Sequence, residues 1–321
     1  MHAIALRYFE EIARVGSMRQ AAERLNVAAS AINRQILKLE RELGVQLFER
    51  LPRGLKLTPA GDLMLRHVRA TLHDFDRLRG EISELRGVKS GLVRIACLDS
   101  LLAYVMPDVI TAFSRRHPAV TFQIESGVHG RVTHLIADGD VDIGVTFNLD
   151  HHPELVLSAD IPMPIMAMMA ASHPLARRKE VTVGDCAAYP LLLQQDTQPI
   201  RSQIDTELQT LHKLRRPLVA CNNMALLKQL VLNGLGIAFY TPIGFLNELE
   251  SGAVRAVPVG SFGMSRLRVG LLLHRRRRPA PAPAAMAEAL GVALKDLGRR
   301  VQQGFGRPAK RRVAVQLTEG A

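Results

Sequence analysis

The chain has 321 residues, enough for two or three domains with hydrophobic cores of their own, and its net charge is +12. No segment approaches 18 uninterrupted apolar residues, and residues 1–12 already contain Arg7, Glu10 and Glu11, unlike a signal peptide. We therefore expect a cytoplasmic protein rather than an exported or membrane-spanning one.

The first predicted elements are two helices joined by a short turn. Ser17 and Gln20 have the spacing of a capping box, so a helix is expected to begin there. A second helix should follow Asn26 and Val27 and run to about Leu43. Its inward stripe is expected to contain Ile32, Ile36, Leu39 and Leu43, and its opposite face Ser30, Asn33, Arg34, Lys38 and Arg41.

A short two-stranded wing is predicted next. Phe48 and Leu57 flank a basic stretch that includes Arg50 and Arg53, with a turn at Arg53-Gly54. A basic wing tip of this kind can enter a minor groove of DNA.

A basic amphipathic helix alone is usually only a solvated face. Here a capped helix, a short turn, a polar helix and a basic wing occur in one order, and this order resembles the winged helix-turn-helix of LysR-type transcriptional regulators. The matching segments are AAERL at 21–25, SAINRQI at 30–36, LE at 39–40, LGVQLFER at 43–50 and LTPAG at 57–61. The resemblance implies contact with double-stranded promoter DNA through Ser30, Asn33, Arg34, Lys38, Arg50 and Arg53.

Two departures from the family pattern concern the second helix. Ala28 and Ala29 stand where the family commonly has Ser-Gln, so the usual capping hydroxyl is missing. Asn33 stands where Ser is usual, and Asn can form two hydrogen bonds to adenine. We expect an operator preference different from that of the commonest members.

Thr58 and Pro59 then predict the start of a helix of roughly 27 residues, about 40 Å long. Its apolar stripe is expected to contain Leu65, Val68, Leu72, Phe75, Leu78, Ile82 and Leu85. Such a helix could simply lie on a core. The resemblance instead implies pairing with a second copy, hence a homodimer, with homotetramers as the family expectation.

From Gly91 the pattern becomes an alternation of strands and helices, which predicts βαβαβ and a parallel sheet. One helix is expected over 101–116, and a last one over Ala284–Leu297. A second α/β unit is predicted from residue 163, with a return to the first unit near residue 266. GLVRIA, ADGDVDIGV and LNGLGIAFYTP resemble the two-lobed, periplasmic-binding-protein-like effector domain of the same family.

A small-molecule effector is expected where strand ends and helix starts of both lobes meet. Free amides after the first strand favour an anion such as a carboxylate, whereas Asp99 argues against one. Each candidate also has an ordinary structural role available, such as a plain cap for Ser100. The candidates are Ser100, Leu101, His129, Thr146, Phe147, Asn148, Thr197, Pro199, Ile200, Asn222 and Asn223.

Catalytic and metal-binding motifs are not found, and we expect no enzyme activity, no cofactor and no metal. Gly234 and Gly236 make only G-x-G after a helix, and the histidines have no companion cysteine or compact second pair. Cys97 and Cys221 lie in apolar, strand-like runs, so reduced and buried thiols are expected rather than a redox switch.

The positive charge lies at the two ends of the chain. Lys and Arg outnumber Asp and Glu by 16 to 11 in residues 1–89 and by 11 to 3 in 274–321, against 15 and 16 in 90–273. Binding of DNA by part of the molecule would give this distribution. A disordered basic tail over 301–321 is either merely solvated or adds nonspecific DNA affinity.

The predicted fold is multidomain: an all-α winged helix-turn-helix over 1–59, a linker and dimerisation helix over 60–89, and a two-lobed α/β domain over 90–300. Lobe I covers about 90–162 and 267–300, and lobe II about 163–266. The predicted function is a LysR-type regulator that responds to an effector and alters promoter access for RNA polymerase. A solute-binding protein fits the two lobes alone, and an effector-independent architectural DNA-binding protein is the alternative.

Overall fold

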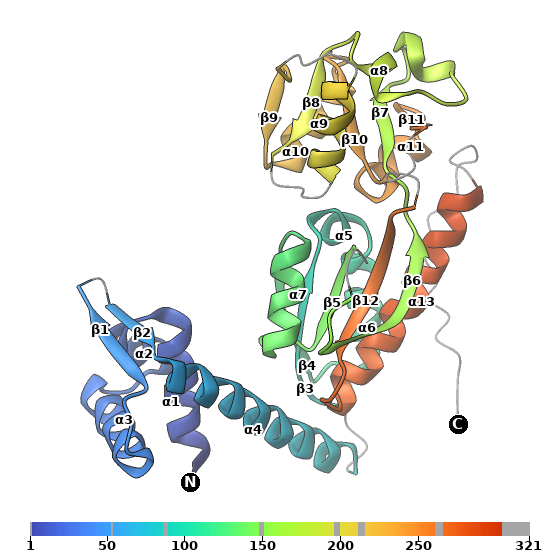
Figure 1. The fold of residues 1–321 in the computed structure, drawn as a ribbon. Helices are drawn as coiled ribbons and strands as arrows, with labels where there is room; N and C mark the ends of the chain where they lie inside the picture. The colour runs from blue at the N-terminus through green and yellow to red at the C-terminus, as the bar shows by residue number, and fades with distance from the viewer. Residues whose placement is uncertain are drawn as a thin grey trace.

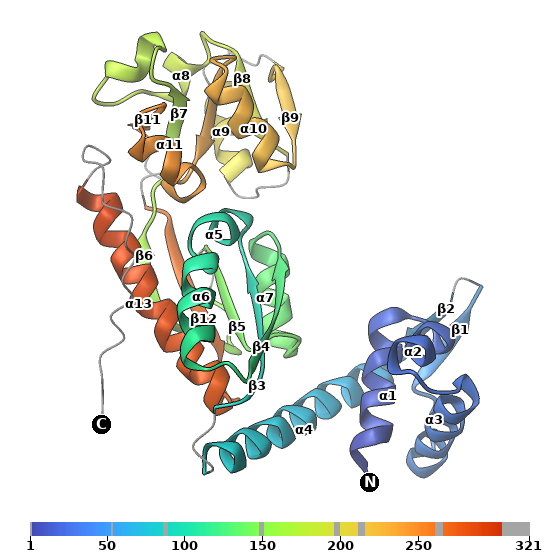
Figure 2. The ribbon, with the colours of Figure 1, turned by 180° about the vertical axis from the view of Figure 1, so that it is seen from behind.

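A computed structural model describes residues 2–52, 54–85, 89–147, 151–195, 200–210, 216–260 and 266–303, without the side chains of 2, 3, 200, 202 and 203. One long helix, α4 (Pro59–Glu84), joins a small N-terminal module to two α/β lobes (Figures 1 and 2). None of the described helices is long and apolar enough to cross a membrane.

The N-terminal module packs three helices and a two-stranded wing around one core. The first helix was not predicted, although its Phe9 and Ile12 are fully buried and the Phe9 ring lies 4.9 Å from that of Phe48. The elements are α1 (His2–Val15), α2 (Met18–Leu25), α3 (Ala29–Leu43), β1 (Phe48–Leu51) and β2 (Gly54–Leu57).

The expected inward stripe of α3 is only partly correct. Ile32 and Ile36 are buried and Leu39 is half-buried, but Leu43 is exposed. The helix ends at Gly44, whose φ of +67° turns the chain, so the last turn of α3 projects beyond the core.

Lobe I is built on a five-stranded sheet with the order β4-β3-β5-β12-β6. β3 pairs in parallel with β4 and β5, as expected, but β12 runs antiparallel to both β5 and β6, so the sheet is mixed. β6 was not predicted from the sequence. The strands are β3 (Gly91–Cys97), β4 (Val120–Ser126), β5 (Ile143–Phe147), β6 (Leu155–Pro162) and β12 (Arg268–His274), with helix α7 (His129–Asp138) between β4 and β5.

The single helix expected over 101–116 is two helices, α5 (Asp99–Tyr104) and α6 (Met106–Arg116). Pro107 explains the break, because proline lacks an amide hydrogen and its ring would collide with the preceding turn.

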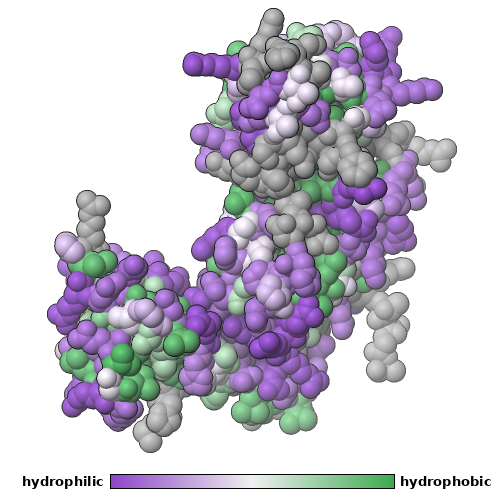
Figure 3. All heavy atoms as spheres, viewed as in Figure 1, coloured by the Kyte–Doolittle hydropathy of each residue, from purple (hydrophilic) through white to green (hydrophobic). Residues whose placement is uncertain are grey.

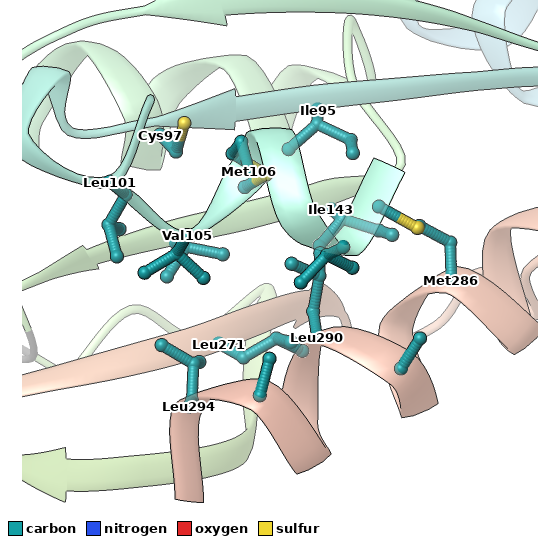
Figure 4. Packing of buried hydrophobic residues seen from close by; sticks show 14 of the residues in the cluster. Ile95, Cys97, Leu101, Val105, Met106, Ile143, Leu271, Met286, Leu290 and Leu294 are labelled. Atoms are coloured by element: carbon teal, nitrogen blue, oxygen red, sulfur yellow. The ribbon is translucent and has the colours of Figure 1, made fainter. Parts of the chain in front are cut away.

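The last helix, α13 (Pro281–Gln303), is longer than predicted and covers one face of the lobe I sheet beside β6 and β12 (Figure 1). Its Met286, Leu290 and Leu294 are fully buried with Met106 of α6 and Leu271 of β12 (Figure 4). Burial of each such side chain contributes about 1.5–3 kcal/mol.

Lobe II has its own five-stranded sheet, in the order β11-β7-β10-β8-β9. The chain enters lobe II after β6 and leaves it after β11, so two crossings join the lobes. Its main elements are β7 (Met166–Ala170), α8 (Val183–Cys186), β8 (Leu191–Gln194), α9 (Ile200–Thr210), β9 (Val219–Cys221), α10 (Met224–Leu232), β10 (Ile237–Tyr240), α11 (Leu246–Glu250) and β11 (Val254–Pro258), with 3-10 turns η1 (Pro174–Arg177) and η2 (Pro242–Phe245).

Gly61, in the first turn of α4, has no room for a side chain. An added Cβ would lie 2.1 Å from the backbone oxygen of Leu47, which already accepts a hydrogen bond from the Thr58 amide. We expect Gly61→Ala to lower the free energy of unfolding by about 1–3 kcal/mol, measured by urea denaturation.

Gly130, in α7, is the matched control for this substitution. A Cβ there would meet nothing within 4 Å, so Gly130→Ala should leave stability unchanged or raise it by up to about 1 kcal/mol. Equal urea midpoints for the two variants would contradict the assigned crowding.

Candidate nucleic-acid interface and ligand cleft

The outer face of α3 presents polar side chains to solvent. Ser30, Arg34 and Lys38 are exposed and Asn33 is half-buried. Lys38 Nζ lies 3.8 Å from a carboxylate oxygen of Glu42, whereas Arg34 has no ion pair within the described residues. A fixed helix with an unpaired guanidinium can donate two hydrogen bonds to a guanine edge in a major groove.

The start of α3 lacks the usual cap, as the sequence predicted. Ala28 precedes the helix and offers no side-chain acceptor to the first-turn amides. These amides and the positive end of the helix dipole form a suitable place for a phosphate group.

The wing is anchored to the turn between α1 and α2. The Leu55 amide donates to the Gly16 oxygen at 2.8 Å, and a Cβ on Gly54 would lie 2.6 Å from that same oxygen. Gly54 also has a φ of +129°, so glycine is required on two counts. Arg50 is exposed on β1, and Arg53 lies outside the described residues.

A polar joint connects α4 to lobe I. His73 Nε2 lies 2.7 Å from the Gly139 oxygen, and Nδ1 lies 3.5 Å from Asp142 Oδ1. The other Asp142 oxygen accepts from the Arg94 amide at 2.7 Å, and Arg69 forms an ion pair with Asp140. Burial raises the pKa of both aspartates. The joint therefore couples the position of α4 to the loop that precedes β5.

One face of α4 is apolar and exposed. Val68 and Leu72 are buried in the module's own core, but further along the helix Phe75, Leu78 and Ile82 are 43–50% exposed. On the face drawn in Figure 3 polar residues predominate and apolar ones form small groups. The exposed face is consistent with the expected pairing of two copies.

A cleft of about 230 Å³ lies between the two lobes. Lobe I lines it with residues 98–100, 126–129 and Phe147, and lobe II with Ile165, Gln194, Asn222, Met224 and residues 239–241. Strand ends and helix starts of both lobes thus meet there, which is where open α/β folds bind ligands.

The predicted effector residues fall into several groups. Ser100, His129, Phe147 and Asn222 line the cleft, whereas Leu101 is fully buried in the lobe I core (Figure 4). Thr146 lies behind the wall, 3.4 Å from His129 Nδ1, and Asn223 caps α10 through its bond from the Leu226 amide. Asn148, Thr197, Pro199 and the side chain of Ile200 lie outside the described residues.

The part of the cleft formed by the end of β10, with Tyr240, and by Thr241 directly after it was not predicted. The rule that ligands sit at the carboxyl ends of parallel strands would have found them, because β10 pairs in parallel with β8. The Tyr240 hydroxyl is buried and has no hydrogen-bond partner among the described residues.

A second polar cluster ties the lobes together beside the cleft. The Tyr104 hydroxyl of α5 donates to Glu248 at 3.2 Å and accepts a hydrogen bond from Lys228 of α10. Lys228 Nζ also lies 3.1 Å from Glu248. Because α5 and α10 both begin at the cleft, this cluster links the two cleft walls.

The cysteines only partly match the prediction. Cys97 and Cys186 are buried, but Cys221 is half-exposed, because β9 is an edge strand. Burial raises the pKa of Cys97 and of Cys186 to about 12. At pH 8 only ~1 in 10,000 of each buried thiol is therefore the reactive thiolate.

We expect iodoacetamide at pH 8 to modify only Cys221 in the folded protein, and all three cysteines after unfolding in guanidinium. Mass spectrometry of the digested protein measures each site. Alkylation of native Cys97 as fast as that of Cys221 would contradict the assigned burial.

Two family models together match most of the chain. Residues 4–62 match the bacterial regulatory helix-turn-helix protein of the lysR family, and residues 86–294 match the LysR substrate binding domain.

Metal-binding clusters of three or more His, Cys, Asp or Glu do not occur in the described part of the chain.

Curated relatives agree with these matches. The chain is 30% identical over 249 residues to an uncharacterized HTH-type transcriptional regulator, y4mQ, of Sinorhizobium fredii, covering 77% of this chain and 80% of that protein. It is 32% identical over 279 residues to the transcriptional dual regulator GltC of Bacillus subtilis, covering 85% and 90%.

Solved structures share the fold. A full-length OxyR variant from Pseudomonas aeruginosa superposes with a TM-score of 0.66 at 20% identity, covering 92% of this chain and 95% of that one. CbnR complexed with its target DNA gives a TM-score of 0.57 at 20% identity, covering 91% and 100%.

Proposed function

Because the chain belongs to the LysR family of bacterial transcriptional regulators, we propose that it controls a promoter in response to a small molecule bound between its lobes. The main support for this proposal is that α4 connects two parts of one chain. One part exposes the polar face of α3, and the other is a two-lobed domain with a cleft.

In this proposal residues 1–59 read the operator. Arg34, Asn33 and Ser30 on α3 contact base edges, while Lys38, Arg50 and Arg53 contact the backbone or the minor groove. Residues 60–89 pair two copies, and residues 90–300 bind the effector and assemble the oligomer, up to a tetramer.

The effector acts by binding more tightly to one relative arrangement of the two lobes than to another. The Tyr104, Lys228 and Glu248 cluster joins the two lobes, so a change in their closure alters its contacts, and the His73 joint connects lobe I to α4. A changed spacing of the recognition helices alters the DNA bend and hence access for RNA polymerase. Neither the cleft nor the comparisons favour the effector-independent alternative.

The test is binding of the purified protein to the DNA just upstream of its own gene, across a salt series. We expect a specific complex that survives salt better than binding to scrambled DNA of equal length. Equal affinities for the two DNAs at every salt concentration would contradict specific regulation.

A further inference from the structure

The cleft between the lobes is short of positive charge. Asp99 is the one carboxylate among its described lining residues, and that lining contains no Lys or Arg, so His129 is its one basic side chain. A carboxylate ligand would lose its hydration there without gaining a Lys or Arg partner, and Asp99 would repel it.

Asp99 occupies one of the helix starts at the cleft, where an anion would be favoured. It is the first residue of α5, where the peptide dipoles attract negative charge. Because α5 has only six residues, the Asp99 carboxylate already meets this attraction. Within the described residues its carboxylate has no ion pair or hydrogen bond from a side chain. It is therefore available to accept a hydrogen bond from an N–H group of a ligand.

Tyr240 supplies the complementary donor on the lobe II side. Its side chain is 7% exposed, its hydroxyl lacks a partner among the described residues, and it lines the same cleft. Burial raises the pKa of Tyr240, and the nearby Cys221 and Asp99 raise it further, so the hydroxyl keeps its proton. A ligand acceptor would give this buried O–H the partner that it lacks.

The rest of the wall combines apolar side chains with polar ones, and the polar ones are Ser100, Ser126, His129, Gln194, Asn222 and Thr241. Val128 and Phe147 of lobe I face the cleft together with Ile165 and Phe239 of lobe II. The volume of about 230 Å³ holds about eight water-sized groups at ~30 Å³ each. The ligand is therefore small, with a flat or aliphatic body and polar atoms at its ends.

We propose that the cleft takes a small amine- or amide-bearing ligand without net negative charge, whose N–H donates to Asp99 and whose acceptor pairs with the Tyr240 hydroxyl. A ligand with a single polar end uses one of the two contacts. This inference deepens the proposed function, since it names the chemical class of the effector.

Three probes with the same ring separate charge from shape: benzylamine, benzamide and benzoate. Each is titrated by calorimetry into the full-length protein and its Asp99→Asn and Tyr240→Phe variants. Asp108→Asn in α6 and Tyr189→Phe in lobe II are matched controls outside the cleft lining. DNA binding is measured on the same preparations.

We expect benzamide and benzylamine to bind at least tenfold more tightly than benzoate. Asp99→Asn should weaken benzylamine about tenfold, and Tyr240→Phe should weaken benzamide about tenfold without lowering the thermal midpoint, because it removes an unpaired buried hydroxyl. The control variants should bind all three probes as the wild type does.

Benzoate binding as tightly as the other two probes would overturn the inference, and so would no binding of any probe at millimolar concentration or unchanged affinities in both cleft variants. Loss of specific DNA binding with the ligand preference intact would refute the regulatory function but leave the ligand class standing.

Discussion

Replacing Arg34 by alanine is expected to lower the affinity for the operator about tenfold to a hundredfold. The side chain is exposed on α3 and has no ion pair within the described residues, so its removal leaves no buried partner behind. A bidentate contact to a base discriminates by about 1–3 kcal/mol, which corresponds to that loss. Electrophoretic mobility shifts with operator and scrambled DNA measure it.

Arg255→Ala is the matched control. Arg255 is exposed on β11 of lobe II, so the variant loses the same charge far along the chain from α3. Its operator affinity should be unchanged. Lys38→Ala should instead weaken both DNAs similarly and reduce the salt slope by about 1. If Arg34→Ala binds the operator as the wild type does, Arg34 does not contact the operator bases.

Local patterns predicted the N-terminal module well because its elements depend on near neighbours. Thr58 caps α4 through the Gly61 backbone amide, as the sequence indicated. Ser17 likewise caps α2 through the Gln20 backbone amide, but the return bond of the predicted capping box is not present in the described residues. The absent cap at Ala28 was also predicted. α1 was missed because its burial depends on Phe48 and the rest of the core rather than on a start signal of its own.

The cleft was harder to predict because its walls meet only when both lobes have folded. Leu101 follows Ser100 directly, yet the α5 helix turns Leu101 into the core and leaves Ser100 at the cleft. Tyr104 and Lys228 are 124 residues apart and carry no shared local signal. The edge strands β6 and β11 were missed for the same reason, since their pairing partners lie far away in the chain.

The exposed apolar face of α4 predicts the second large effect, which is a loss of dimer formation. Leu78 is 50% exposed and Ile82 46%, on a helix whose opposite side contacts lobe I through His73. Leu78→Glu should raise the dimer dissociation constant about a hundredfold or more. Each lost leucine contact is worth about 1.5–3 kcal/mol, and a symmetric dimer loses two. Analytical ultracentrifugation across a concentration series measures the change.

Leu78→Met is the matched control, since it keeps an apolar side chain of similar volume and should leave the dimer intact. Because the Leu78 side chain lies outside the module's own core, Leu78→Glu should keep the wild-type thermal midpoint at concentrations where both proteins are monomeric. Operator affinity should fall when dimerisation is lost, since a monomer has one recognition helix and reads one half-site. A dimer of unchanged strength in Leu78→Glu would mean that α4 does not pair the subunits and that the interface lies elsewhere in the chain.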